Sequence, residues 1–224
     1  YFPRAIHAIT MPLVAEFWAK GKKELLKAGI EQLYKYYVIV ILPAVLIMFS
    51  FAELLIILLY GREYILAAVP MKILSVGMVF EVLSFANWSF FSGIGEPRIN
   101  SKSLYYAAIF NLIGNLILIP LIGINGAAIA TAVSSLIILV YGFMKIREFI
   151  DVNLPLKLWL KNLFAGIILV LLISILKKLL VMNVWIEAII VIGLSGLCYI
   201  GLLFAMNVIN FNELKDIYKR LTAK

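Results

Sequence analysis

The chain has 224 residues, a formal net charge of +8 and a hydrophobic share of 64%, and its mean hydropathy is +1.06. This composition and the repeated apolar runs of membrane length exclude an ordinary soluble domain and predict a polytopic, all-α transmembrane helix bundle. The runs are solidly apolar, whereas a membrane β-barrel would alternate polar and apolar residues. With one Cys and one His, this chain alone cannot assemble a disulfide framework, a zinc cluster or a Cys/His nucleophile pair, so we expect no metal, cofactor or catalytic residue.

The basic residues lie in the connections between the apolar runs. This placement is typical of a membrane protein whose cytoplasmic loops carry Lys and Arg, and it does not favour a nucleic-acid-binding surface. We therefore expect membrane lipids, and not nucleic acid, as partners of these residues.

Residues 1–35 are predicted to hold the end of a truncated span followed by a cytoplasmic amphipathic connector. Arg4, His7 and Pro12 interrupt the first apolar stretch before it is long enough to cross a bilayer. Between residues 16 and 35, apolar residues recur at helical spacing with five Lys residues among them. That pattern predicts a helix lying on the membrane surface.

Residues 36–148 are predicted to contain four spans, at about 36–60, 65–91, 103–121 and 124–144. The last two come from a stretch of 42 residues, from Ser103 to Met144, that carries no charge. A single helix of that length would measure about 63 Å, twice the roughly 30 Å of a bilayer core. The stretch must therefore fold back, and Pro120, Gly123 and Gly126 indicate where.

Two further features are expected within these spans. Pro43 is predicted to kink the first span. The fourth span carries small residues at four-residue spacing, which predicts a surface where helices pack closely: Gly126, Ala130 and Ser134, and beside them Ala127, Thr131 and Ser135.

Residues 149–206 are predicted to form two additional spans, one starting near Trp159 and ending near residue 180, the other over about 184–206. Residues 207–224 are predicted to form a cytoplasmic amphipathic tail, because Asn210 followed by Glu213 resembles a capping box. This alternation of spans places 16 Lys and Arg residues on one side of the membrane and 4 on the other. The first side, including the C-terminus, is thus predicted to face the cytoplasm from the cytoplasmic membrane.

Two charges within the first two spans are predicted to form an ion pair. Glu53 lies 8 residues before Gly61, and Lys72 lies 8 residues after Tyr64. Equal distances from one turn give equal depth on consecutive antiparallel helices, near the outer leaflet. The pair is either structural or takes part in ion coupling or gating.

A polar layer near the bilayer midplane, made of Glu81, Asn111 and Asn115, supplies candidates for a substrate path, and Asn87 at the end of the second span is a fourth candidate. Asn115 follows Asn111 by one helical turn, so the two share a face. These residues either hydrogen-bond helices to one another or line a water-filled path. No basic residue of this chain is expected at the depth of Glu81, so its partner is expected outside the chain.

Arg98 and Lys102 follow a Gly-Ile-Gly-Glu-Pro-Arg connection at the predicted cytoplasmic boundary. They are candidates for binding an anionic head group or phosphate. The alternative is that they only set the topology of the chain.

Several of these motifs, in this order, resemble those of polysaccharide and O-antigen flippases in the multidrug/oligosaccharidyl-lipid/polysaccharide exporter superfamily. They are Pro3 with the basic connector, Leu-Tyr-Gly-Arg-Glu-Tyr at 59–64, Gly-Ile-Gly-Glu-Pro-Arg at 93–98, Asn111 to Asn115, and Gly-Ile-Asn-Gly-Ala-Ala-Ile-Ala-Thr at 123–131. The resemblance covers nearly the whole chain.

The resemblance implies two six-helix lobes around a central cavity that work by alternating access. This chain would then be the second lobe from the end of its second helix, plus two terminal helices, with the first lobe of the same protein as a partner. The implied function is translocation of a lipid-linked oligosaccharide or polysaccharide precursor for the cell envelope. The alternatives are a drug/cation antiporter of the same superfamily and a structural membrane subunit. A membrane-bound enzyme would need an acidic or His cluster outside the membrane, which these short connections lack.

Overall fold

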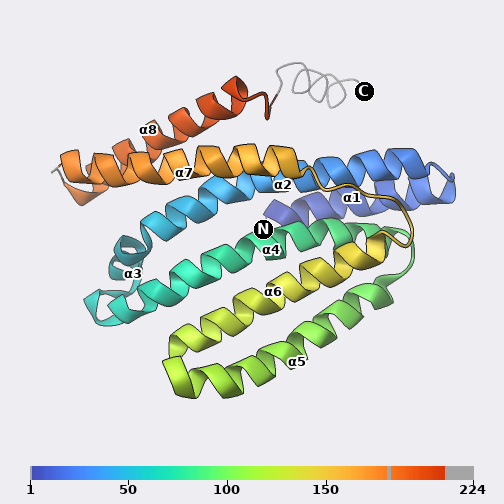
Figure 1. Ribbon diagram of the computed structural model, residues 1–224, viewed down its shortest axis with the longest axis horizontal. Helices are drawn as coiled ribbons and strands as arrows, with labels where there is room; N and C mark the ends of the chain where they lie inside the picture. Colours follow the sequence, from blue (N-terminus) through green and yellow to red (C-terminus); the bar gives the residue numbers. More distant parts are fainter. Residues whose placement is uncertain (1, 181–182, 210–224) are drawn as a thin grey trace. The chain divides into compact units, whose positions relative to one another are not determined.

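A computed structural model describes residues 2–180 and 183–209 (Figure 1). The described part is all-α, in this order: α1 (Phe2–Ala19), α2 (Lys23–Ser50), α3 (Ala52–Tyr60), the 3-10 helix η1 (Arg62–Ala67), α4 (Ala68–Gly93), α5 (Pro97–Ile122), α6 (Ile124–Ile146), α7 (Leu156–Leu179) and α8 (Val184–Ala205). Six helical segments within the described residues are long and apolar enough to cross a membrane. The prediction of an all-α protein with six spans is thus confirmed, whereas the predicted tail helix from Asn210 onward lies outside the described residues.

The chain divides into two compact units, residues 1–155 and residues 156–224. In unit 2, α7 and α8 pack against each other. Tyr199 Oη of α8 donates to Asn162 Oδ1 of α7 at 2.5 Å, and Lys161 Nζ donates to the backbone oxygen of Met206, just beyond α8, at 2.8 Å. Polar contacts therefore support the end of this helix pair where α7 begins and α8 ends.

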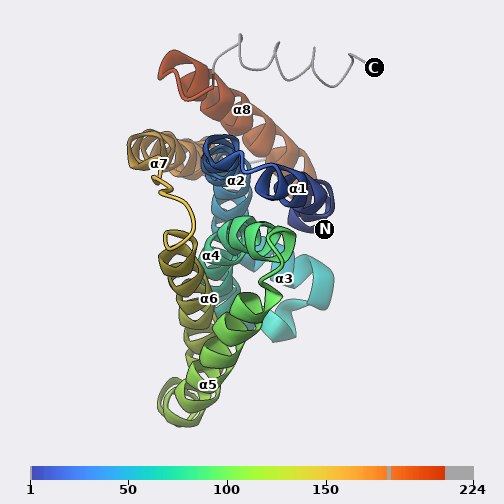
Figure 2. The same cartoon turned by 90° about the vertical axis from the view of Figure 1, so that its right-hand side faces the viewer.

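Unit 1 is built around α4, which packs against α1, α2 and α6, while α6 also packs against α5 (Figures 1 and 2). Glycines bring these helices close together. An ideal Cβ at Gly77 of α4 would lie 2.9 Å from Ala132 Cα of α6, and one at Gly114 of α5 would lie 3.0 Å from Ala130 Cβ. The small-residue stripe of α6, in which Gly126, Ala130 and Ser134 are buried, permits the approach of α5, whereas Gly77 of α4 meets Ala132, which lies outside the stripe.

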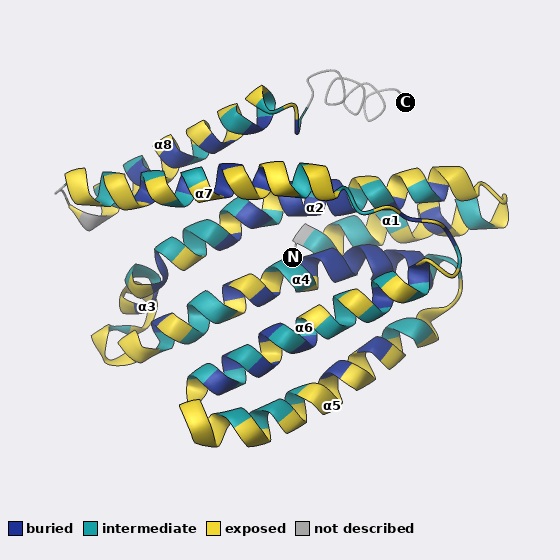
Figure 3. Cartoon of the chain, viewed as in Figure 1, coloured by how far each residue is buried: buried dark blue, intermediate teal, exposed yellow. Residues whose placement is uncertain are grey.

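Much of α5 is exposed (Figure 3). Within α5 only Ser103 and Ala107 are buried, while large apolar side chains such as Leu116 and Leu121 are exposed at 69% and 71%. A helix with so much exposed apolar surface is stable when lipid covers it, because lipid places no cost on exposed apolar side chains.

The tight turn predicted inside the uncharged stretch separates α5 from α6 at a single residue, Gly123, whose φ is +61°. Such a left-handed conformation favours glycine. Gly126 follows in the first turn of α6, and an ideal Cβ there would lie only 2.4 Å from the backbone oxygen of Leu118. Glycine at both positions therefore allows the two helices to fold back on each other.

The structure differs from the prediction in residues 16–35. No separate surface helix forms: α1 ends at Ala19, a short turn follows, and α2 runs without interruption from Lys23 to Ser50. Leu26 and Ile30, which belong to the apolar residues at helical spacing between residues 16 and 35, are almost fully buried. Their helical spacing continues through Tyr34 and Tyr37, which are also buried. One buried apolar face therefore runs from the predicted surface helix into the predicted first span, and the sequence gives no break between the two.

The first predicted span is also divided differently. α2 continues helically through Pro43 and ends at Ser50, and the chain resumes as α3 at Ala52. Between the two helices Phe51 has φ −111° and ψ 14°, outside the helical range. The interruption thus lies at Phe51, eight residues beyond the expected kink.

Candidate functional site

Glu81 of α4 is an exposed carboxylate between two hollows of unit 1. The larger hollow has a volume of about 540 Å³ and the smaller one about 340 Å³. Both are lined by Glu81 and by Phe85, one helical turn further along α4. Across the described residues, Glu81 has no hydrogen bond or salt bridge. An unpaired charge inside a membrane span is costly, and such charges usually mark functional positions.

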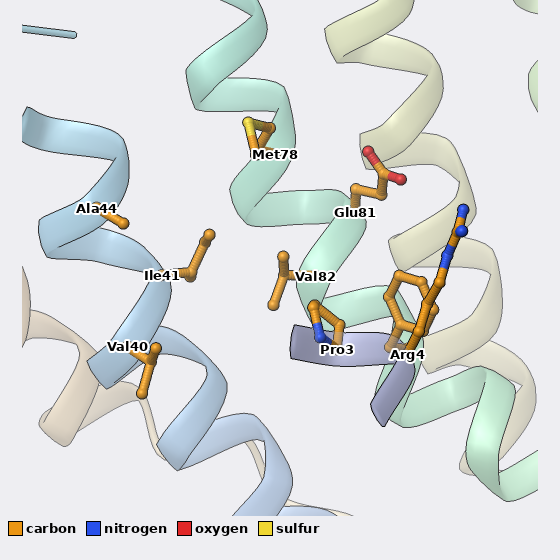
Figure 4. Close-up of a pocket in the computed structure, with 9 residues that line it drawn as sticks. Pro3, Arg4, Val40, Ile41, Ala44, Met78, Glu81 and Val82 are labelled. Carbon is orange, nitrogen blue, oxygen red and sulfur yellow. The ribbon is translucent and has the colours of Figure 1, made fainter. Parts of the chain in front are cut away.

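The larger hollow lies among α1, α2 and α4, and a second charge faces it. Apart from Glu81, its lining is Pro3 and Arg4 of α1, Val40, Ile41 and Ala44 of α2, and Met78, Val82 and Phe85 of α4. Figure 4 shows the side chains of Arg4 and Glu81 extending from their helices into the same region. The sequence-based expectation that no basic residue of this chain shares the depth of Glu81 is thus wrong. Arg4 is a site residue that sequence reasoning missed.

Hydrogen bonds between α1 and α4 explain why Arg4 and Glu81 lie at the same level. Thr10 Oγ1 donates to Ser89 Oγ at 2.9 Å, and His7 Nδ1 lies 2.9 Å from the same oxygen. An ideal Cβ at Gly93 would lie 2.6 Å from Val14 Cβ. Residue numbers rise together along these contacts, so the helices are parallel and the start of α1 meets the middle of α4.

The smaller hollow lies among α4, α5 and α6 and is lined by two of the predicted path residues, Glu81 and Asn111. Its polar lining is Glu81, Ser84 and Trp88 of α4, Asn111 of α5, and Thr131, Ser134 and Ser135 of α6. Asn111 Nδ2 donates to Thr131 Oγ1 at 3.2 Å, and Asn115 Nδ2 donates to Asn111 Oδ1 at 2.9 Å. Glu81 and Asn111 therefore share this hollow, while Asn115 holds the Asn111 amide from one turn away.

Asn87 has a different position from the other predicted path residues. It is almost fully buried, it accepts a hydrogen bond from Tyr34 Oη of α2, and its Nδ2 donates to Leu139 O of α6 at 3.4 Å. An ideal Cβ at Gly142 would lie 2.5 Å from that nitrogen. Asn87 thus holds three helices together and does not line either hollow around Glu81, which corrects its assignment as a path residue.

The structure also brings Glu53 and Lys72 together. Lys72 Nζ lies 2.9 Å from Glu53 Oε1, with the Glu53 side chain 65% exposed and that of Lys72 29% exposed. The contact joins Glu53, in the first turn of α3, to Lys72, in the second turn of α4.

Arg98 and Lys102 lie on the first two turns of α5, where both are exposed. The connection before them is anchored by Asn100, whose Nδ2 donates to Ser92 Oγ at 3.3 Å. The two cations are therefore held at a defined end of α5. Across the described residues, no group of three or more His, Cys, Asp or Glu side chains is arranged to hold a metal ion.

Taken together, the fold and the site define a multi-pass membrane protein with charged and amide side chains in hollows among its spans. No family model matches the chain. It is 31% identical over 225 residues to an uncharacterized membrane protein of Methanocaldococcus jannaschii, covering 99% of this chain and 43% of that protein. The chain spans less than half the length of the curated relatives described here.

Two relatives with named functions are more distant. A probable low-salt glycan biosynthesis flippase, Agl15, of Haloferax volcanii is 23% identical over 59% of this chain and 28% of its own length. The lipid II flippase MurJ of Bacillus subtilis is 27% identical over 62% of this chain and 26% of its own length. The solved structure of a lipid II flippase MurJ in its inward closed conformation matches all of this chain and 45% of its own, with a TM-score of 0.74 and 16% identity. The chain is thus a distant homologue of flippases in the multidrug/oligosaccharidyl-lipid/polysaccharide exporter superfamily, as its motifs predict.

Proposed function

We propose that this chain forms one half of a transporter that moves a lipid-linked oligosaccharide or polysaccharide precursor across the cytoplasmic membrane by alternating access. The match of the whole chain to 45% of a MurJ structure supports this proposal, as does the homology to a flippase named for glycan biosynthesis. In this arrangement residues 36–148 belong to the second of two lobes, residues 149–206 are two additional helices, and the first lobe is a partner within the same protein.

The observation that carries the proposal is the position of Glu81 between the two hollows. A carboxylate without a salt bridge inside a span is stabilised by water, by a polar ligand or by a nearby cation such as Arg4, because lipid and apolar side chains cannot solvate it. Glu81, Asn111 and Thr131 then form a polar wall that can face a sugar head group. The exposed apolar face of α5 stays in contact with lipid tails, so the lipid part of the substrate does not have to enter the protein.

The proposed orientation places the C-terminus, Arg98 and Lys102 on the cytoplasmic side. The positive-inside tendency supports this orientation, because that side carries 15 of the 20 Lys and Arg residues once Arg4 is placed at the level of Glu81. There the two exposed cations of α5 contact phosphate groups of membrane lipids or of the substrate. The proposed activity is transport without chemical conversion.

The proposal is tested by reconstituting the intact protein into liposomes that contain a fluorescent lipid-linked oligosaccharide. A membrane-impermeant quencher added outside measures how fast the label moves between leaflets. We expect transfer faster than in protein-free vesicles. Correctly folded protein without transfer of the lipid-linked sugar would contradict the proposal. In that event, cation-coupled drug uptake by the same vesicles would indicate an antiporter, and no transport of either substrate would indicate a structural subunit.

A further inference from the structure

The bend between α2 and α3 is the starting point for a further inference. Phe51 alone separates the two helices, and α3 leaves the direction of α2 (Figures 1 and 2). Ser50 Oγ donates to Leu46 O at 2.7 Å, a contact within a helix that often bends it. The chain therefore has a defined bend point at the end of α2, without a proline or glycine at that position.

A single cation on α4 contacts both sides of this bend. Lys72 Nζ lies 2.9 Å from Glu53 Oε1, in the first turn of α3. The same nitrogen lies 6.0 Å from the centroid of the Phe49 ring, in the last turn of α2, which is within the range of a cation–π contact. The ammonium group of Lys72 thus fixes the two helices relative to each other.

The segment beyond the bend, α3 with η1 (residues 52–67), has little apolar packing of its own. It shares a small core with the start of α4 in which Ala52, Ile56 and Ala68 are buried and Ala67 and Met71 are partly buried. Alanine side chains bury little apolar area, so such a core contributes less stability than the aromatic and branched side chains elsewhere in unit 1. Elements with few buried apolar contacts open at lower free energy than the core.

We propose that Phe51 is a hinge, that Lys72 is the latch that holds it, and that release of this latch lets residues 52–67 move as a flap at this end of unit 1. The latch follows from the two contacts of Lys72 and does not depend on what the protein transports. We further propose that movement of the flap affects transport, and this second part rests on the proposed function. The two parts are therefore tested by separate measurements.

Hydrogen–deuterium exchange of the intact protein in lipid nanodiscs tests the latch. Lys72→Met removes both contacts, and we expect amides of residues 52–67 to exchange about three- to tenfold faster, in line with one ion pair and one cation–π contact. Glu53→Gln and Phe49→Leu each remove one contact and are expected to give smaller increases. Lys145→Met is the matched control, because it breaks the 2.7 Å pair with Glu148 at a distant position and is expected to leave residues 52–67 unchanged.

Two results would overturn the latch. One is unchanged exchange over residues 52–67 in Lys72→Met. The other is a uniform increase throughout α4, α5 and α6, which would show that Lys72 stabilises the whole unit. The liposome assay then tests the role of the flap: an altered transfer rate in Lys72→Met supports it, and an unchanged rate removes it. Absence of transfer in the wild-type protein, with the exchange pattern as expected, would contradict the proposed function and leave the latch in place.

Discussion

The close approach of α5 and α6 at Gly126 gives a quantitative test of the fold. In Gly126→Ala the new Cβ would lie 2.4 Å from the backbone oxygen of Leu118 and 2.5 Å from its carbonyl carbon. Carbon atoms in good contact lie about 3.5 Å or more apart, so the two backbones must separate by about 1 Å. Because the neighbour is backbone and not the end of a flexible side chain, we expect a loss of about 1–3 kcal/mol in stability.

Gly29→Ala is the matched control for this substitution. Gly29 also lies within a helix, α2, but its ideal Cβ would meet no atom within 4 Å. Alanine in an unhindered helical position stabilises by roughly 0.5–1 kcal/mol relative to glycine. Thermal unfolding in detergent, followed by tryptophan fluorescence, should therefore show a lower melting temperature for Gly126→Ala and an unchanged or higher one for Gly29→Ala. Wild-type stability in Gly126→Ala would refute the close packing of α5 on α6.

Three further predictions concern contacts of unit 1. Tyr34→Phe leaves Asn87 Oδ1 without the hydrogen bond it receives in the structure; we expect unfolding in detergent at a lower temperature, at a cost of roughly 0.6–2 kcal/mol. Ser89→Ala removes both polar contacts from α1 to α4, so cysteine pairs placed across these helices should cross-link less specifically, and an unchanged cross-linking pattern would count against the contact. Replacing Arg98 and Lys102 together by Gln should reduce the amount of anionic lipid that native mass spectrometry detects on the purified protein, and an equal amount would indicate that the two cations only set topology.

The spans and the turn at Gly123 could be predicted because both depend on local properties of the sequence. An uncharged stretch of 42 residues must fold back in a bilayer, and a positive φ favours glycine at the turn. The extent of α2 could not be predicted in this way. Its basic first turns look like a surface helix, and only the burial of Leu26 and Ile30 shows that they belong to the long helix.

The polar contacts show the same division between local and long-range information. Glu53 and Lys72 flank a short turn between consecutive segments, so counting from that turn is enough to bring them together. Arg4 and Glu81 lie on parallel helices far apart in the sequence, and their common level depends on the contacts of Ser89. The role of Asn87 likewise depends on Tyr34, a residue of another helix. The residue pattern within one helix does not show which level of a distant helix lies beside it.

The rate at which a lipid-linked oligosaccharide crosses between leaflets, compared for the wild-type protein and Glu81→Gln, tests the central claim most directly. We expect the wild-type protein to transfer the label and Glu81→Gln to transfer it about tenfold more slowly, equivalent to ~1.4 kcal/mol in the barrier, with an unchanged melting temperature. Gln keeps the shape of the side chain and removes its charge, so such a loss would be due to the carboxylate. No transfer above protein-free vesicles by the wild-type protein, or equal rates for the two proteins, would contradict this account of the site.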